Sequence, residues 1–258
     1  SSRSLADAPA FPLKDTETIL RDARRIDAAG NNAEESGVRP IRHYCLVASG
    51  RQLSERDTDA LCETVAELRR QTSLLPCASL GLLEAKQLRR LKDAGLVRIH
   101  NNLETSAAFF PKLCATHTYE DKLRTLREAK EAGLALCSGG IFGVGETMRD
   151  RIALAFTLRA FSPSSVPVNL FDPVRGTPLG ERPVIDGGTI RRIGALFRLM
   201  LPAAEIRLAA GRDYLADTGI SCFLSGMNAA ITGDMLTVGG VRIAKDLESL
   251  RALSFTFS

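Results

Sequence analysis

A short segment recurs three times in the chain and constrains its fold more than any other feature. Each copy ends a helical pattern on alanine and glycine, at Gly30, Gly95 and Gly133. Glycine just past a helix adopts the left-handed conformation without steric cost, so each copy predicts a helix end. Repeated steps of helix, glycine and strand are typical of parallel strands joined by helical crossovers.

Hydrophobic patterning predicts seven strands, at residues 41–48, 74–79, 96–102, 134–140, 166–171, 205–210 and 229–233. Predicted helices alternate with them, at residues 16–30, 54–68, 84–94, 119–132, 148–160, 189–201 and 244–253. Residues 1–14 and 31–39 are polar and are predicted to be loops. We predict a single α/β domain over residues 1–258, a (β/α)8 TIM-type barrel. Because a helix precedes the first predicted strand, the barrel is predicted to lack its first strand. A doubly wound open sheet is the alternative.

Composition narrows the function classes. A chain of 258 residues that is 45% hydrophobic has the size of one such barrel. Its net charge of +4 comes from Lys and Arg scattered among acidic residues, so we expect no nucleic-acid partner. No apolar run approaches the roughly 20 residues of a membrane span, and no signal peptide opens the chain, so we expect no membrane partner.

The six cysteines are spaced too widely and irregularly for a disulfide framework, which predicts a reducing, cytoplasmic setting. Cys45, Cys77 and Cys137 fall at similar depth in three predicted strands, and Arg207 falls likewise in a fourth. Inward side chains of barrel strands converge on the axis, so the three thiols are predicted to meet there. Thiolates suit iron–sulfur clusters or zinc. The alternative is that each cysteine is a small buried hydrophobic residue.

Polar residues follow two predicted strands at the barrel face where ligands bind. His100, Asn102 and Glu104 follow the third strand, and Asn169 ends the fifth. Amides and carboxylates suit hydroxyl or ureido groups of a ligand. Helix capping and turn formation are the alternatives. The other cysteines lack such a placement and are interpreted as structural: Cys62, Cys114 and Cys222. His43 and His117 have no matching partners and are interpreted as surface or packing residues.

A glycine-rich turn lies between the predicted strand at 134–140 and the helix that follows Thr147. Strand, glycine turn and helix N-terminus together present backbone N–H groups to a ligand in many α/β proteins. Close packing of strand against helix is the alternative.

The segment from Cys137 to Thr147 resembles the signature segment of biotin synthase, a radical S-adenosylmethionine (SAM) enzyme. The same resemblance continues in order at residues 102–106, 116–119, 165–169 with 176–178, and 206–212. It runs from Ser1 to about Leu253, which is nearly the whole chain. It implies a (β/α)8 barrel of the radical SAM type.

The resemblance also implies an activity, the conversion of dethiobiotin into biotin by radical sulfur insertion. In that reaction SAM and a [4Fe–4S] cluster generate the radical, and an auxiliary iron–sulfur cluster, a [2Fe–2S] in the best-known form, donates the sulfur. The implied partners are dethiobiotin, a reductant protein such as flavodoxin or ferredoxin, and a second copy of the chain.

Residue roles follow from the resemblance alone. It implies that the auxiliary cluster is held by Cys45, Cys77, Cys137 and Arg207. The implied SAM-binding residues are Asn102, Glu104, Gly139 and Gly140. The implied substrate-binding residues are His100, Asn102, Asn169 and Thr237, although His100 replaces an asparagine found in some members.

One family feature is missing from the printed sequence. The Cys-x3-Cys-x-x-Cys loop that holds the [4Fe–4S] cluster does not occur, and the closest cysteine pair, Cys62 and Cys77, lies 15 positions apart. The family places that loop immediately before a segment like residues 1–4. We therefore expect an N-terminally truncated chain that does not cleave SAM by itself. A degenerate paralogue that acts as a non-catalytic metal- or ligand-binding protein is the alternative, and zinc could then occupy the cysteines.

Overall fold

The computed structural model describes residues 14–34, 43–48, 53–231 and 243–253. These residues belong to two compact units, which we describe in turn. The N-terminal unit comprises Ala10–Asn101 and Glu120–Leu136, and the C-terminal unit comprises Asn102–Tyr119 and Cys137–Thr256. Among the described residues, no helix combines the length and the apolar character needed to cross a membrane.

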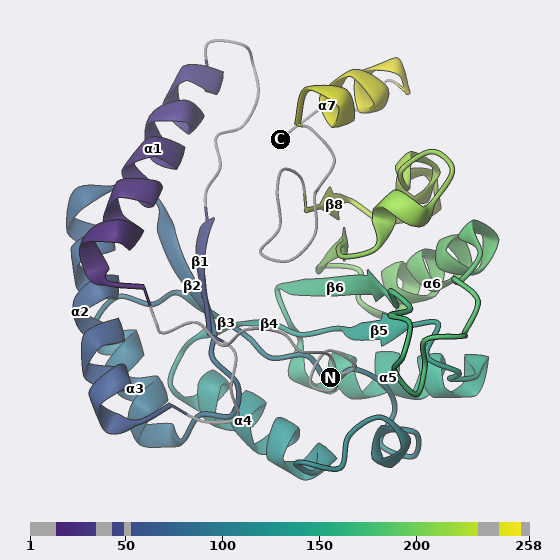
Figure 1. Ribbon diagram of the computed structural model, residues 1–258, viewed down its shortest axis with the longest axis horizontal. Coiled ribbons are helices and arrows are strands. Elements are labelled where there is room, and N and C mark those ends of the chain that lie inside the picture. The colour runs from purple at the N-terminus through teal and green to yellow at the C-terminus, as the bar shows by residue number, and fades with distance from the viewer. Residues whose placement is uncertain (1–13, 35–42, 49–52, 232–242, 254–258) are drawn as a thin grey trace. The chain divides into compact units, whose positions relative to one another are not determined.

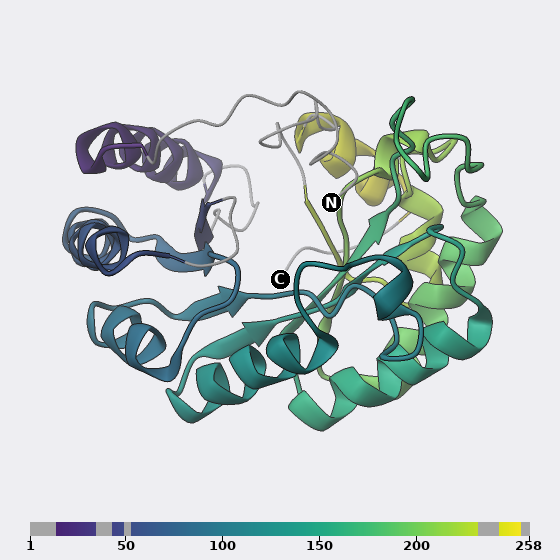
Figure 2. The same cartoon turned by 60° about the horizontal axis from the view of Figure 1, so that its bottom comes forward.

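Parallel strands form the centre of the N-terminal unit: β1 (His43–Val47), β2 (Leu75–Ser79) and β3 (Arg98–His100). The helices α1 (Thr16–Glu34), α2 (Glu55–Gln71) and α3 (Ala85–Asp93) lie side by side along one face of these strands (Figures 1 and 2). Helix α4 (Tyr119–Glu131) comes after β3 in the chain. Leu46, Ala78 and Ile99 are in register across the three strands and are all buried, so they form one apolar row.

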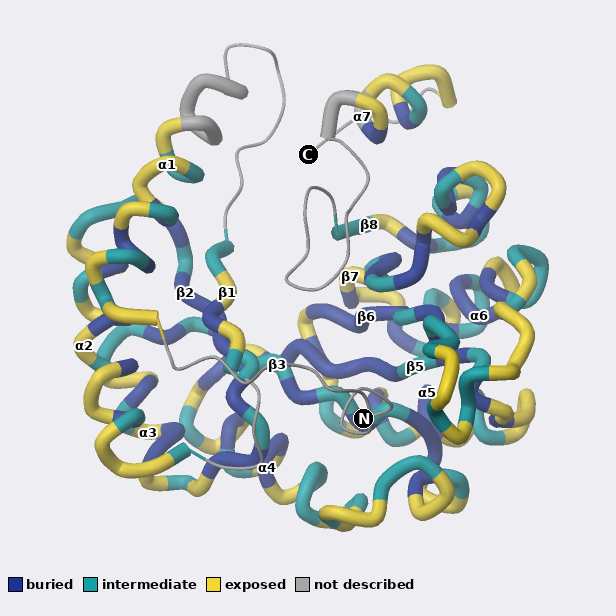
Figure 3. The backbone as a smooth tube through the Cα atoms, viewed as in Figure 1, coloured by how far each residue is buried: buried dark blue, intermediate teal, exposed yellow. Residues whose placement is uncertain are grey.

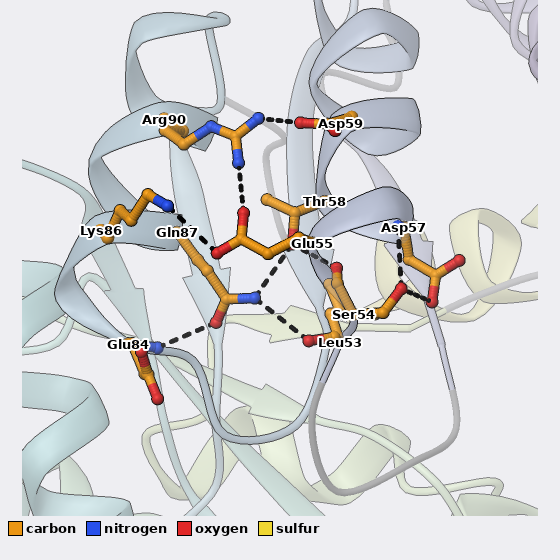
Figure 4. Close-up of polar contacts among 10 residues, drawn as sticks. All are labelled: Leu53, Ser54, Glu55, Asp57, Thr58, Asp59, Glu84, Lys86, Gln87 and Arg90. Atoms are coloured by element: carbon orange, nitrogen blue, oxygen red, sulfur yellow. Dashed lines mark hydrogen bonds and ion pairs between the residues drawn. The ribbon is translucent and has the colours of Figure 1, made fainter.

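Local capping explains where α2 and α3 begin (Figure 4). The Ser54 hydroxyl oxygen accepts the backbone N–H of Asp57 at 3.0 Å, which caps α2 as predicted. On α3, the buried Gln87 amide donates to the Thr58 hydroxyl at 2.9 Å and accepts the Glu84 backbone N–H at 3.2 Å. One side chain therefore satisfies polar groups at the starts of both helices.

Two of the three predicted glycine caps are confirmed. Gly95 has φ +107° and Gly133 has φ +75°, both in the left-handed region. In each case the N–H of the next residue donates to a carbonyl five residues earlier, at 2.9 Å after Gly95 and 3.0 Å after Gly133. These bonds satisfy carbonyls that the helix end would leave without partners.

The third predicted cap, at Gly30, is wrong. Helix α1 continues through Gly30 to Glu34, so residues 31–34 are helical and only 35–39 of the predicted loop lie outside the described residues. Glycine within a helix costs about 1 kcal/mol relative to alanine. Its neighbours Ala28 and Ala29 favour the helix, and this local preference offsets the cost.

The C-terminal unit contains a second set of parallel strands: β5 (Gly140–Phe142), β6 (Ser165–Leu170), β7 (Glu205–Leu208) and β8 (Ala229–Ala230). The helices of the unit are α5 (Met148–Phe161), α6 (Gly187–Met200) and α7 (Ile243–Ala252). Short 3-10 helices add Phe110–Lys112, Arg212–Tyr214 and Ile220–Ser225. Strand β6 pairs on both sides and is buried over nearly its whole length (Figure 3).

The strand predicted over 134–140 is two strands in the structure, β4 (Ala135–Cys137) and β5. The described residues therefore contain eight strands rather than seven. The break falls at Ser138 and Gly139. A Cβ atom on Gly139 would lie 2.0 Å from the Pro167 carbonyl oxygen, so the chain passes β6 too closely there for regular pairing.

Candidate functional site

In the N-terminal unit, Cys45 and Cys77 are register partners on β1 and β2. Partners in adjacent strands point to the same face of a sheet, about 5 Å apart. Their face is opposite to the apolar row of Leu46 and Ala78. Cys77 is 3% exposed, whereas Cys45 is exposed. The sequence-based expectation of matched depth is therefore confirmed for this pair.

In the C-terminal unit, Cys137 and Arg207 are in direct contact. An Arg207 Nη2 hydrogen is donated to Cys137 Sγ over 2.8 Å. Cys137 pairs with Ser165 on β6, and Arg207 pairs with Pro167 two residues further along the same strand. Both side chains therefore leave the sheet on one face, and the guanidinium reaches across β6 to the thiol.

Buried polar atoms near this contact have no hydrogen-bond partner in the described part of the chain. They are Arg207 Nε and the hydroxyl oxygen of Ser165, which is the register partner of Cys137. Buried polar groups are satisfied in most native structures. A bound polar or charged group beside Cys137 would satisfy them, so the residues present fit an inorganic cluster with sulfur ligands.

The four proposed cluster ligands are divided between the two units. Cys45 and Cys77 belong to the N-terminal unit, and Cys137 and Arg207 to the C-terminal unit. Within the residues that the structure describes, no group of three or more His, Cys, Asp or Glu side chains is arranged to hold a metal ion.

Asn102, Glu104 and Gly139 form a compact latch in the C-terminal unit. The Gly139 N–H donates to Asn102 Oδ1 at 3.0 Å, and the Gly139 carbonyl accepts the N–H groups of Leu103 and Glu104 at 3.1 and 3.2 Å. The Glu104 carbonyl accepts the Ile141 N–H at 2.8 Å. Two of the predicted SAM-binding residues are thus fixed against the glycine pair.

The two predicted SAM-binding glycines allow this close approach. A Cβ atom on Gly140 would lie 2.6 Å from the Glu104 carbonyl oxygen, and Gly139 meets Pro167 in the same way. Glu104 itself has φ +67°, an uncommon conformation for a non-glycine residue. Its Oε2 atom is buried. Strain of this kind is characteristic of functional sites.

The predicted substrate-binding residues are placed as follows. Asn169 on β6 donates its amide to the Gly140 carbonyl at 3.1 Å and accepts the Ala210 N–H at 3.4 Å. Asn169 therefore belongs to the C-terminal unit together with Asn102. His100 is half-buried at the end of β3 in the N-terminal unit. Thr237 lies outside the described residues.

In the glycine turn before α5, backbone N–H groups donate to a carboxylate side chain of the same turn. The Glu146 carboxylate accepts the N–H groups of Gly143 (3.1 Å) and Val144 (2.9 Å). It also accepts Arg151 Nε at 2.9 Å in a buried ion pair. The expectation that these N–H groups face an external ligand is therefore wrong for Gly143 and Val144. The sequence feature that could have indicated this arrangement is Glu146, because it places a carboxylate directly after the glycine run.

We predict that Glu146→Gln lowers the free energy of unfolding by about 2 kcal/mol, because hydrogen bonds to a buried charged group are worth roughly 1.5–3 kcal/mol. The variant also leaves the Arg151 guanidinium, only 12% exposed, without its counter-charge. Urea denaturation of both proteins measures the difference. Arg149→Gln, a change at an exposed position at the start of the same helix, is the control. Equal losses from the two changes would contradict this role of Glu146.

A second polar connection joins the segment after β3 to α5. The buried Ser106 hydroxyl donates to Asp150 Oδ1 at 2.6 Å, and the Thr147 hydroxyl donates to Asp150 Oδ2 at 2.6 Å. Hydrogen bonds from the Ser106 hydroxyl, the Thr147 hydroxyl and the Thr147 N–H lower the pKa of Asp150 below its usual value. The ionised carboxylate is therefore the form that the fold stabilises.

Ser106→Ala is expected to reduce stability in a pH-dependent way. Because the folded pKa of Asp150 is lowered, its contribution is complete above the unfolded pKa of about 3.9 and is lost as pH falls through the folded value. The difference between wild type and variant should therefore be largest near pH 6 and shrink below pH 4. Urea denaturation across that range measures it, and a constant difference would contradict this account.

The remaining cysteines each have a different setting. Cys62 is on α2, where burial raises the pKa of its thiol. Cys222 is buried in the 3-10 helix Ile220–Ser225, as expected of a packing residue, and burial raises the pKa of its thiol to about 11. Cys114 Sγ lies 3.3 Å from His117 Nδ1, a contact between two residues that sequence reasoning treated separately. Burial opposes ionisation of this thiol, but hydrogen bonds with the Thr116 hydroxyl and backbone N–H groups outweigh it and lower its pKa.

Two family models match the chain. The Radical SAM superfamily matches residues 11–158, and the Biotin and Thiamin Synthesis associated domain matches residues 167–256. Among similar proteins, a biotin synthase of Clostridium botulinum is 46% identical over 241 residues, which cover 93% of this chain and 76% of that protein. A biotin synthase of Akkermansia muciniphila is 44% identical over 95% of this chain and 73% of its own length.

Solved structures show the fold. HydG, a maturase of the [FeFe]-hydrogenase, has a TM-score of 0.77 at 14% identity and covers 98% of this chain and 59% of its own. Methylornithine synthase (PylB) has a TM-score of 0.64 at 16% identity over 96% of this chain and 95% of its own. The predicted fold class, an α/β barrel of the radical SAM type, is confirmed. The matched models and the extent of identity together show that the chain belongs to the biotin synthase family of the radical SAM superfamily.

Proposed function

We propose that this chain forms the barrel of an enzyme that converts dethiobiotin into biotin by radical SAM sulfur insertion, the reaction of its family. The observation that carries the proposal is the contact between Arg207 Nη2 and Cys137 Sγ, with the buried Arg207 Nε and Ser165 Oγ beside it. A guanidinium beside a buried thiol offers positive charge and a sulfur ligand at one place, which suits an anionic group with sulfur ligands.

The proposed ligands of the auxiliary cluster are those that the family resemblance implies: Cys45, Cys77, Cys137 and Arg207. Support comes from each unit separately, since Cys45 and Cys77 share one face and Arg207 contacts Cys137. The family uses SAM and iron–sulfur clusters, and we propose a [2Fe–2S] type here. When bound, these groups supply the radical and the sulfur atom.

The chain's own residues are proposed to bind and orient SAM and dethiobiotin. Asn102 and Glu104 are proposed to bind SAM. Their hydrogen bonds with Gly139 hold both residues in place. Asn102, Asn169, His100 and Thr237, the residues that the family resemblance implies, are proposed to bind dethiobiotin. The amides of the two asparagines and the hydroxyl of Thr237 complement its ureido ring. Fixed positions of this kind lower the entropic cost of reaching a reactive geometry.

The family acts on dethiobiotin and takes electrons from a reductant. We propose a flavodoxin or ferredoxin as that reductant and a homodimer as the assembly. Met148, Ile152 and Phe156 are exposed at 39%, 38% and 58%, and their spacing of four residues aligns them on one face of α5. A second copy of the chain would cover such a stripe.

Three further expectations remain predictions: that residues 1–258 form one domain, that the chain works in the cytoplasm, and that these 258 residues alone do not cleave SAM. The last can be checked directly by incubating the reduced protein with SAM and measuring 5′-deoxyadenosine.

Reconstitution tests the proposed function. The chain is purified anaerobically and incubated with iron and sulfide, and bound iron, acid-labile sulfide and the visible spectrum are measured. We expect a brown protein that loses its colour and sulfide in Cys77→Ala and Cys137→Ala. Cys62→Ala, which removes a thiol from α2, is the control and should retain both. A colourless protein that binds zinc without sulfide would contradict the proposal and support a structural metal site.

A further inference from the structure

The three cysteines outside the proposed cluster ligands differ in their surroundings. Cys222 is 1% exposed and Cys62 is half-buried on α2, and burial raises the pKa of both thiols. Cys114 is also half-buried, but it lies in the C-terminal unit with the exposed residues Ala115 and Thr116 directly after it. Cys62 is therefore a reference thiol of similar burial in different surroundings.

Two polar side chains contact the Cys114 thiol. Its Sγ atom lies 3.3 Å from His117 Nδ1 and 3.4 Å from the Thr116 hydroxyl oxygen. Thr116 Oγ1 also lies 3.1 Å from His117 Nδ1, so the three groups form a triangle. A hydroxyl can accept from an imidazole N–H and donate to sulfur at the same time. An imidazole within hydrogen-bond reach of a thiol is the arrangement that activates cysteine nucleophiles.

A buried residue, Phe110, holds both members of the Cys114–His117 pair. The Cys114 N–H donates to the Phe110 carbonyl at 3.0 Å. The His117 ring meets the Phe110 ring edge-on with centroids 5.6 Å apart, and Phe110 is only 2% exposed. Because one buried residue fixes the thiol from its backbone and the imidazole from its ring, the contact between the two is part of the packed fold.

Hydrogen bonds favour the thiolate at this position. Burial opposes ionisation of Cys114, but the Thr116 hydroxyl and the backbone N–H groups of His117 and Thr116 outweigh it and lower the pKa of the thiol. The thiolate is the form that attacks disulfides, and an attacking thiol works best when its pKa is near the ambient pH. These surroundings suit a reactive cysteine better than a packing residue.

We propose that Cys114 is a site of reversible thiolation, where it exchanges with a low-molecular-weight disulfide of the glutathione type and His117 accepts its proton. The thiol proton passes to His117 Nδ1, Sγ attacks one sulfur of the disulfide, and a new S–S bond forms as the old one breaks. The leaving thiolate takes the proton back from the imidazolium. Cys114 is oxidised and one low-molecular-weight thiol is released in reduced form, so atoms and electrons balance.

The test uses the full chain and oxidised glutathione at pH 7, with peptide mapping by mass spectrometry to measure modification at each cysteine separately. We expect Cys114 to be modified about tenfold faster than Cys62, because a lower thiol pKa raises the thiolate fraction. Dithiothreitol should remove the glutathionyl group. Alkylation by iodoacetamide should show the same preference, with a midpoint at lower pH for Cys114 than for Cys62. This exchange requires neither SAM nor a cluster, so its outcome is independent of the proposed function.

Variants separate the triangle from simple exposure. His117→Gln removes the imidazole, and Thr116→Val removes the hydroxyl. Each should slow the modification of Cys114 about fivefold or more, the effect of losing one hydrogen bond of about 1 kcal/mol, and should move the midpoint of its alkylation to higher pH. Thr116→Ser keeps the hydroxyl and should match the wild type. Cys62 should react at the same rate in all three variants.

Two results would overturn the inference. If Cys114 reacts no faster than Cys62 in the wild type, Cys114 is not a reactive site. If fast reaction persists in both His117→Gln and Thr116→Val, exposure alone explains it, and the role of the triangle is wrong. Circular dichroism identifies any variant that fails to fold, and the comparison of Cys114 with Cys62 within the wild type remains decisive in that case.

Discussion

Asp246→Asn is expected to lower the free energy of unfolding by about 3–5 kcal/mol, the usual cost of removing one partner from a buried ion pair. Arg212 donates through Nη1 and Nη2 to the two Asp246 oxygens at 2.9 and 2.7 Å. The same guanidinium donates to the carbonyls of Thr218 and Ile231 at 2.8 and 3.1 Å. Asparagine keeps the volume of the side chain but leaves the buried cation without a counter-charge.

Urea denaturation followed by circular dichroism measures the loss. Glu248→Gln is the matched control, because it removes a carboxylate from an exposed position on the same helix, α7. Such a surface change should cost less than about 0.5 kcal/mol. The double variant Arg212→Met/Asp246→Leu should recover part of the stability, since apolar residues of similar volume often replace a buried pair without loss. If Asp246→Asn and Glu248→Gln lose the same amount, the pair does not anchor α7.

The parts of the fold that sequence reasoning predicted correctly depend on neighbours in the chain. Ser54 caps α2 by accepting the N–H of a residue three positions later. Gly95 and Gly133 each end a helix, and in both cases the N–H of the residue after the glycine donates to a carbonyl five residues earlier. Such local preferences are legible in any single sequence. Gly30 shows their limit, because the helix-forming residues around it decide whether the glycine ends a helix or lies within it.

The break between β4 and β5 could not be predicted in the same way. Gly139 has no room for a Cβ atom because of the Pro167 backbone, and Pro167 lies on another strand. Nothing within residues 134–140 themselves signals this close approach, so the sequence predicted one continuous strand there. A pattern with period two indicates which face a residue occupies, but it does not report which neighbouring backbone approaches closely.

For the candidate site, position in the strands was informative and charge was not. Matched depth in the predicted strands and the family resemblance both grouped Cys45, Cys77, Cys137 and Arg207. Within the separate units, the structure pairs Cys45 with Cys77 and places Arg207 against Cys137. Two buried charges were missed. Glu146 looked like part of a helix start, and Arg98 looked like an ordinary strand residue, because the burial of a charge becomes visible only when its neighbours are placed.

Gly139→Ala is expected to lower the free energy of unfolding by about 3 kcal/mol or more, at the upper end of the cost of overpacking. Its Cβ atom would lie 2.0 Å from the Pro167 carbonyl oxygen and 2.8 Å from the Pro167 nitrogen. Both are backbone atoms of the buried strand β6, so neither can move aside as a flexible side chain would. The strain would also displace Asn102 and Glu104, which are held by the N–H and carbonyl of Gly139.

Gly187→Ala is the matched control in the same unit. A Cβ atom there meets only Leu215 Cδ2 at 3.7 Å, an ordinary van der Waals contact, and the position lies at the start of α6. Alanine favours a helix over glycine by up to about 1 kcal/mol, so this variant should be neutral or slightly more stable. Denaturation measures stability, and equilibrium dialysis with SAM after anaerobic reconstitution measures whether binding falls with it in Gly139→Ala. A Gly139→Ala protein as stable as Gly187→Ala would show that β6 does not confine Gly139. A destabilised variant that binds SAM as the wild type does would instead show that the latch does not position Asn102 and Glu104 for SAM.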